Sequence, residues 1–64
     1  MSDRPKRCYQ VEPFRKYWRV ACLDYQRNRR FNHPSLWKDR ADAEKYAQMM
    51  RRWWEEKGGE VVPA

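Results

Sequence analysis

The side chains of this sequence that are best suited to chemistry are arginines interleaved with aromatic rings in its first half. The planar guanidinium group of arginine binds phosphates and guanine edges through paired hydrogen bonds. Tyr17, Tyr25 and Phe31 lie between the basic residues, and unpaired bases can stack on such rings. The pattern favours binding of nucleic acid. The candidate contact residues are Arg15, Tyr17, Arg19, Arg27, Arg29 and Arg30.

The distribution of charge points to the same half of the chain. Residues 1–34 hold nine Lys and Arg against three acidic residues, whereas residues 35–64 hold six of each. The whole surplus of +6 therefore lies in the first half. Such a basic segment suits an acidic partner, either nucleic acid or an acidic protein surface, and the neutral half is expected to support the fold.

The residue types give little support to other kinds of site. Two cysteines and one histidine cannot supply the four ligands of a structural zinc site. His33 and Ser35 are close in sequence, but a nucleophile also needs an oriented base within hydrogen-bonding reach. The only glycines are Gly58 and Gly59, so there is no glycine-rich phosphate loop. We expect no catalytic residues, no metal and no cofactor, and so do not expect an enzyme.

The length allows one small domain with a thin core, because 64 residues bury a small share of their surface. Four Trp, four Tyr and two Phe supply the bulk that such a core needs. We expect a flexible basic arm at residues 1–7, a single domain at residues 8–58 and a disordered tail at residues 59–64.

The expected location is the cytoplasm, with no membrane partner. The sequence has no apolar run of the kind that a signal peptide or a membrane span requires. Cys8 and Cys22 are then expected to be free thiols, although they could pair if their segments faced each other.

The first half reads as antiparallel strands. In the clearest strand, residues 16–25, alternation places Trp18, Val20 and Cys22 on one face, which we assign to the core. Residues 26–28 read as a turn, since Asn28 tolerates the positive φ of tight hairpins, and residues 29–33 as the return strand.

A third strand is an open alternative. Residues 9–11 alternate and could join the hairpin to give a three-stranded meander. Pro13 is expected to end this strand or to confine it to an edge of the sheet, because proline cannot donate to a strand ladder.

The second half is predicted to be one helix of about 18 residues, or roughly 27 Å. Asp39 is a suitable N-cap, and Gly58 and Gly59 supply a stop. One apolar stripe repeats at helical spacing and consists of Ala43, Tyr46, Ala47, Met50, Trp53 and Trp54. Neighbours on a helix lie about 100° apart, so one of the two tryptophans is expected to be half exposed, at the core edge or as an anchor for a protein partner.

The order of these features resembles a known class of DNA-binding domain. A basic hairpin with an inward Trp18 is followed by Trp37, a cap at Asp39 and an Ala-rich amphipathic helix. This resembles the domains of the plant ethylene-response-factor family and is similar to the arm-binding N-terminal domains of phage-type integrases. In both families a three-stranded sheet enters the major groove and the helix packs behind it. The resemblance covers about residues 9–57 and implies a binding face, with Arg15, Tyr17, Arg19, Arg29 and Arg27 as candidate contacts.

We therefore expect an α+β domain, with a two- or three-stranded antiparallel sheet packed on one C-terminal helix. Its expected function is non-enzymatic binding of nucleic acid, DNA in preference to RNA, through the basic β-hairpin, in an accessory or regulatory role of a phage or mobile element. The alternative is a protein-interaction module, such as a phage-encoded inhibitor of a host enzyme. A homodimer is compatible with the thin core and a half-exposed tryptophan.

Overall fold

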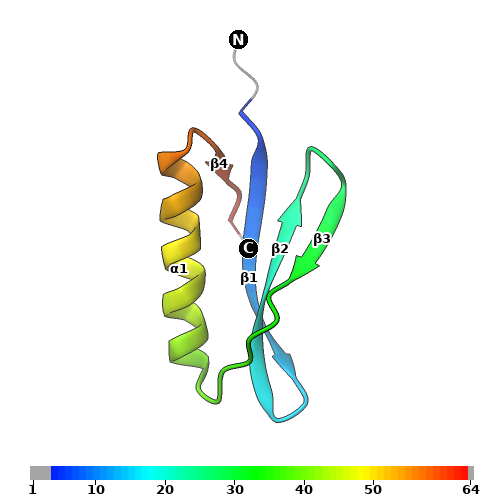
Figure 1. Cartoon of the computed structure of the whole chain (residues 1–64), viewed down its shortest axis with the longest axis vertical. Coiled ribbons are helices and arrows are strands. Elements are labelled where there is room, and N and C mark those ends of the chain that lie inside the picture. The colour runs from blue at the N-terminus through cyan, green and yellow to red at the C-terminus, as the bar shows by residue number, and fades with distance from the viewer. Residues whose placement is uncertain (1–3, 64) are drawn as a thin grey trace.

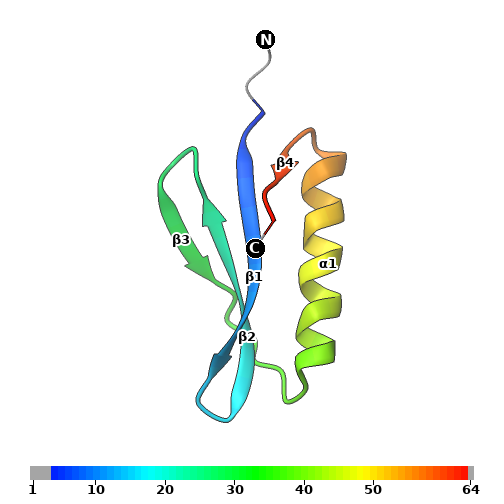
Figure 2. The ribbon, with the colours of Figure 1, turned by 180° about the vertical axis from the view of Figure 1, so that it is seen from behind.

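The computed structural model describes residues 4–63 and has an α+β architecture (Figure 1). The elements follow one another as β1 (Lys6–Phe14), β2 (Tyr17–Asp24), β3 (Arg29–Asn32), α1 (Arg40–Glu56) and β4 (Glu60–Val61). The strands form one sheet in the order β3-β2-β1-β4. Helix α1 lies along one side of this sheet, as both views show (Figure 2).

The expected fold class is confirmed, but the sheet has four strands rather than two or three. The first three strands form an antiparallel meander, which was one of the two alternatives that the sequence allows. The fourth, β4, pairs parallel to β1, which makes the sheet mixed.

Strand β1 is longer than expected because Pro13 does not end it. Pro13 lies opposite Trp18 in the β1–β2 register. The N–H of Trp18 donates to the carbonyl of Trp37 (2.7 Å), and the N–H of Trp37 donates back (2.9 Å), so the polar backbone of Trp18 faces away from β1. Pro13 therefore belongs to a non-hydrogen-bonded pair, where its missing N–H costs no bond to β2.

A tight turn joins β1 to β2, and it contains residues that we expected to lie in or beside the second strand. Arg15 and Lys16 form this turn, and Arg15 has a φ of 57°. A two-residue hairpin loop of this kind requires a positive φ at its first position, which glycine usually provides. An arginine there carries some backbone strain.

The turn between β2 and β3 is the one predicted from Asn28, whose φ is 51°. The carboxylate of Asp24 holds this turn from the end of β2. It accepts hydrogen bonds from the backbone N–H of Gln26 (3.1 Å) and of Arg27 (3.2 Å). Asp24 is buried, so these bonds and its ion pair with Arg7 (3.6 Å) compensate the lost hydration.

Helix α1 begins after Asp39, which occupies the predicted N-cap position with an extended backbone. Its side chain makes no capping hydrogen bond. At the other end, Gly58 adopts a φ of 92°, and the N–H groups of Gly58 and Gly59 donate to the carbonyls of Glu55 and Trp54. This is a Schellman ending, and glycine provides the left-handed conformation that it needs.

The core lies between α1 and the centre of the sheet. Tyr9, Val20, Ala43 and Ala47 are buried there. The two alanines on α1 are small, so the helix can approach the sheet closely. The larger side chains that surround this centre and pack against it are Val11, Trp18, Cys22, Trp37, Tyr46, Met50 and Trp54.

Of the two adjacent tryptophans, Trp53 is the exposed one, with 41% of its surface accessible. Trp54 points inward, and its Nε1 donates to the carbonyl of Pro5 (3.2 Å). Gly59 is buried against its ring. The prediction that one of the pair is half exposed is confirmed.

The C-terminal segment that was expected to be a disordered tail contains β4. The N–H of Glu60 donates to the carbonyl of Pro5 (2.9 Å), and that of Val62 donates to Arg7 (2.8 Å). Lys6 and Arg7, expected in a flexible arm, are the first residues of β1. Residues 1–3 of that arm and Ala64 lie outside the described residues.

The remaining edge of β1 is held by the helix. Nη2 of Arg51 donates to the carbonyl of Tyr9 at 2.6 Å, just beyond the point where β4 stops pairing.

Cys8 and Cys22 are free thiols, as expected. They occupy adjacent positions of the β1–β2 register, Cys8 opposite Leu23 and Cys22 opposite Tyr9, and so point to opposite faces of the sheet. None of the helices within residues 4–63 has the length and apolar character that a membrane span requires.

We predict that Gly59→Ala destabilises the fold by about 1–3 kcal/mol, because the added Cβ would overlap the indole of Trp54. Urea denaturation followed by tryptophan fluorescence measures the change. Met49→Ala, at an exposed position of α1, is the control and should cost less than about 0.5 kcal/mol. Equal stability of the Gly59 variant and the wild type would contradict this packing.

Candidate nucleic-acid interface

The sheet has one face packed against α1 and one face turned away from it. Residues opposite each other in register share a face, and Tyr9, Val11 and Val20 define the side toward α1. The alternate residues define what we call the outer sheet face. They are Lys6, Cys8, Gln10, Glu12, Phe14, Tyr17, Arg19, Ala21, Leu23, Arg30 and Asn32.

Glu12 lies at the centre of the charged groups on this face. Its Oε2 accepts a hydrogen bond from Nη2 of Arg19 (3.1 Å), and its Oε1 pairs with Nη2 of Arg30. One carboxylate therefore joins residues of β1, β2 and β3. It cancels one of the two positive charges and fixes the position of both guanidinium groups, so the net charge of this trio is +1.

Aromatic side chains lie beside these arginines. The Cζ of Arg19 is 4.6 Å from the centroid of the Phe14 ring, and that of Arg15 is 5.5 Å from it. These are distances at which a cation is attracted to a ring face. Tyr17 lies opposite Phe14 in register and is 38% exposed, so the end of the sheet near the β1–β2 turn combines positive charge with open rings.

The two hairpin turns carry the basic residues that are least neutralised. Arg15 and Lys16 are exposed in the β1–β2 turn, and Arg27 is exposed in the β2–β3 turn. Among the described residues, none of the three has a carboxylate within 4.0 Å. The turns lie at opposite ends of the meander (Figure 1), so the outer sheet face extends between two basic ends.

The six residues predicted as contacts do not form one compact patch. Tyr17, Arg19 and Arg30 share the outer sheet face, whereas Arg15 and Arg27 lie in the opposite turns. Arg29 pairs with Asp24 in register and so points to the α1 side of the sheet. The sequence pattern identified the basic half of the chain, but it did not show which of these residues lie on each face of the sheet or in its turns.

Glu12 and Phe14 are the members of this surface that sequence reasoning missed. Both lie on β1 beyond residues 9–11, the part for which the sequence predicts a strand that Pro13 ends or confines to an edge. Had the alternation been continued through Pro13, Gln10, Glu12 and Phe14 would have fallen on one face, opposite Tyr9 and Val11. That Glu12 holds two arginines could not be foreseen, since Arg30 is 18 positions away in the chain.

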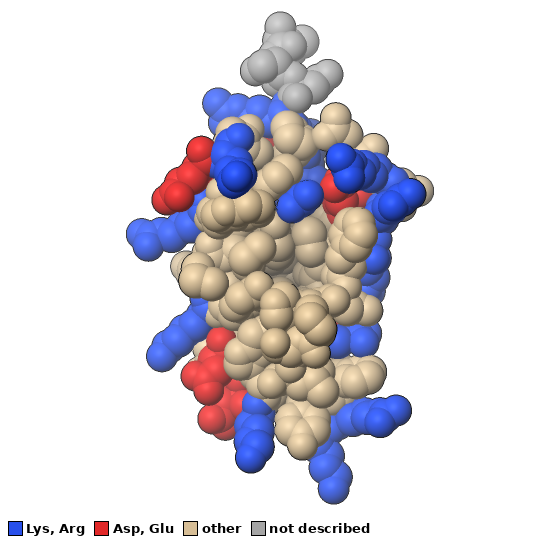
Figure 3. Space-filling model, viewed as in Figure 1, with Lys and Arg blue, Asp and Glu red and all other residues tan. Residues whose placement is uncertain are grey.

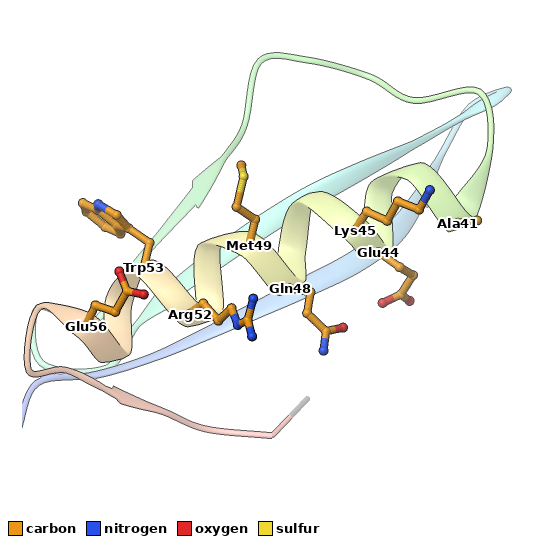
Figure 4. Close-up of a pocket in the computed structure, with 8 residues that line it drawn as sticks. All are labelled: Ala41, Glu44, Lys45, Gln48, Met49, Arg52, Trp53 and Glu56. Carbon is orange, nitrogen blue, oxygen red and sulfur yellow. The ribbon is translucent and has the colours of Figure 1, made fainter.

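The solvent-facing side of α1 does not form an enclosed site. Figure 4 shows eight side chains there, all of which come from α1 and spread in different directions around it. No other element contributes to the depressions between them, so these open directly to solvent. Charges of both signs, such as Lys45, Arg52 and Glu56, lie on this surface.

On the α1 side of the sheet, burial changes the ionisation of two groups. Burial raises the pKa of the Tyr9 phenol, although a hydrogen bond from Nη1 of Arg7 (3.3 Å) partly opposes this. Burial also raises the pKa of the Cys22 thiol. Both groups are thus kept in their neutral forms, which does not suit Cys22 to act as a nucleophile.

His33 is half-buried rather than a surface residue. Its ring lies 4.6 Å from that of Tyr46 and 5.5 Å from that of Trp37, and its Nδ1 accepts a hydrogen bond from the N–H of Ser35 (3.1 Å). Within residues 4–63, no three His, Cys, Asp or Glu side chains are grouped so that they could hold a metal ion.

No protein-family model, curated protein or solved structure matches this chain.

We predict that the protein becomes less stable as the pH rises above about 9. The folded state keeps the protons of Cys22 and Tyr9, whereas the unfolded chain loses them near the ordinary pKa values of 9.0 and 10.0. The full contribution is present below these values and is lost as the pH rises through them. Urea midpoints at pH 7, 9 and 10.5 measure the effect.

The matched variant for this test is Tyr9→Phe combined with Cys22→Ala. Its urea midpoint should fall less between pH 7 and pH 10.5 than that of the wild type. An equal fall in both proteins would assign the pH dependence to other groups.

Proposed function

We propose that this chain is a small, non-enzymatic protein that binds nucleic acid, DNA in preference to RNA, through the outer sheet face and the two basic turns beside it. The observation that carries the proposal is the uncovered outer sheet face between two turns whose basic residues have no acidic partner in the described chain.

The balance of charge supports this choice. Within residues 4–34, nine Lys and Arg stand against two acidic residues, Glu12 and Asp24. Both of these acids are already paired with arginines, so neither is free to repel a phosphate. Electrostatic attraction of this kind provides most of the affinity in non-specific binding of nucleic acid.

The shape of the sheet suits contact with duplex DNA. Toward the β1–β2 turn, beyond the residues that pair with β3 and β4, the hairpin is a two-stranded ribbon, and such a ribbon fits the major groove, which is about 12 Å wide. In this mode Arg19 and Arg30 are held by Glu12 at the centre of the contact, while Arg15 and Arg27 reach phosphates at its ends. The meander backed by one helix is also the arrangement that the resemblance to sheet-plus-helix DNA-binding domains implies.

The setting that we propose is a cytoplasmic one, in an accessory or regulatory role of a phage or mobile element. The free thiols of Cys8 and Cys22 suit a reducing compartment. The role itself rests on the resemblance of the sequence to phage-type integrase domains.

The first test is the salt dependence of binding, measured by fluorescence anisotropy with a labelled short duplex. Micromolar protein should bind at about 50 mM salt and lose affinity steeply by about 200 mM. Arg15→Gln and Arg27→Gln should each weaken binding several-fold and reduce the slope of log K against log salt by about one. Arg19 is left intact, because its removal would also break its ion pair with Glu12.

The control for this test is Arg52→Gln, at an exposed position on the solvent-facing side of α1. It removes the same charge without touching the sheet. The proposal fails if no binding occurs at about 50 mM salt, or if Arg52→Gln weakens binding as much as the turn variants do.

A second prediction concerns Glu12, whose removal should strengthen binding while weakening the fold. Glu12→Gln removes a negative charge from the outer sheet face and frees two guanidinium groups, so affinity should rise roughly 2–5-fold at low salt. The lost pairs are partly exposed and should cost about 0.5–1 kcal/mol of stability. Glu56→Gln on α1 is the control, with the same change of charge. Weaker binding in Glu12→Gln alone would show that Glu12 positions its arginines for the ligand.

A further inference from the structure

Helix α1 leaves β3 uncovered on the side where the two could have packed together. Within the described residues, α1 contacts β1, β2 and β4 but makes no contact with β3. Phe31 of β3 points to the α1 side of the sheet, since it lies opposite Cys22 in register. It nevertheless remains 46% exposed. An apolar side chain on the inner face of the sheet is therefore only about half covered.

A groove with a volume of about 290 Å³ lies between the helix and this strand. Val20 and Cys22 of β2 form its floor, Tyr46 and Met50 of α1 form one wall, and Phe31 forms the other. Figure 3 shows the corresponding surface, which is largely uncharged and hollowed near its centre. The volume is at the lower end of the range for small-molecule pockets, so the groove suits one large side chain rather than the broad face of a folded domain.

Two further apolar side chains are exposed on α1 outside the groove. Met49 and Trp53 are 56% and 41% exposed. They follow Tyr46 at spacings of three and seven residues, which places all three on the same flank of the helix. Single exposed apolar residues are common, so the proposal rests on the groove itself, whose helical wall is Tyr46 and Met50.

Positive charge lies at the borders of this groove on the sheet side. The guanidinium group of Arg7 lies 3.9 Å from the Trp54 ring at one end, and its buried Nε lies 3.6 Å from a carboxylate oxygen of Asp24. Arg29 projects from β3 on the same face as Phe31. The carboxylate nearby, Asp24, is already engaged by Arg7 and by two backbone amides of the turn. In Figure 3 the acidic groups lie mainly along the α1 side.

We propose that this groove binds an acidic segment of a partner protein that inserts one large apolar side chain beside Phe31. The apolar floor and walls would take the side chain, while the exposed Arg29, which forms no ion pair with the described residues, would pair with a flanking carboxylate. A second copy of this chain fits less well, because bringing two β3 strands together would gather the Arg29 and Arg30 of both copies. This site is on the opposite side of the sheet from the outer sheet face, so it does not depend on the proposed binding of nucleic acid.

The test uses the full chain, labelled with ¹⁵N, and two synthetic peptides. One peptide is a run of Asp and Glu with a single central Trp, and the other has Asn and Gln in place of the acids. The acidic peptide should shift the backbone signals of Cys22, Phe31 and Met50, and the neutral peptide should bind at least about fivefold more weakly.

Two variants and two matched controls locate the site. Phe31→Ser and Arg29→Gln should each weaken binding of the acidic peptide at least about fivefold. Tyr25→Ser likewise removes an aromatic ring and Arg27→Gln a positive charge, both in the exposed β2–β3 turn, and they should leave peptide binding unchanged. Since Arg27→Gln is also expected to weaken binding of nucleic acid, the two proposals can fail separately.

Several results would overturn the proposal. These are shifts confined to other residues, equal affinity for the acidic and neutral peptides, or no effect of Phe31→Ser. A labelled oligonucleotide that shifts Cys22, Phe31 and Met50 would assign the groove to nucleic acid instead. Sedimentation that shows a dimer in the wild type and a monomer in Phe31→Ser would assign it to a second copy of the chain.

Discussion

The indole of Trp54 joins three parts of the chain at one point. Its ring lies over Gly59, its Nε1 bonds the carbonyl of Pro5, and the guanidinium group of Arg7 lies on it. These contacts hold the C-terminal end of α1 against β1 and β4. A helix anchored on that side of a four-stranded sheet cannot also cover β3, and the groove beside Phe31 follows from this. The position of the Trp54 side chain thus decides which strands α1 covers on the inner face of the sheet and which strand it leaves exposed.

The two faces of the sheet are organised in different ways. On the inner face, small alanines and large rings fill the space under α1, and Asp24 and Arg7 satisfy each other at the border. On the outer sheet face, the strands are linked by ion pairs instead of apolar packing, because Glu12 of β1 pairs with Arg19 of β2 and Arg30 of β3. The surplus of positive charge can gather on the sheet because the acids that it contains are all used in such pairs. This separation lets one thin domain offer two surfaces of different chemistry.

The parts of the fold that depend on local pattern could be predicted from the sequence. The helix, its apolar stripe and the turn at Asn28 follow from periodicity and from the conformational freedom of single residues. The length of β1 depends instead on its register with β2, which places Pro13 opposite Trp18 in a non-hydrogen-bonded pair. Strand β4 has only two residues, and it is held by hydrogen bonds from its backbone N–H groups to the carbonyls of Pro5 and Arg7. The division of the arginines between faces required the register of three strands, which no local pattern contains.

Pro13 also decides in which direction the sheet can be extended. On the free edge of β1 it offers no N–H, the carbonyl of Tyr9 accepts a hydrogen bond from Arg51, and β4 pairs with Lys6 and Arg7. The opposite edge, β3, has no such cover among the described residues. A sheet with two open edges can add copies without end and form a fibre, whereas a sheet with one open edge can join a single neighbour and then stops. Pro13 and Arg51 therefore leave the β1 side with fewer free backbone groups for a further strand than the β3 side has.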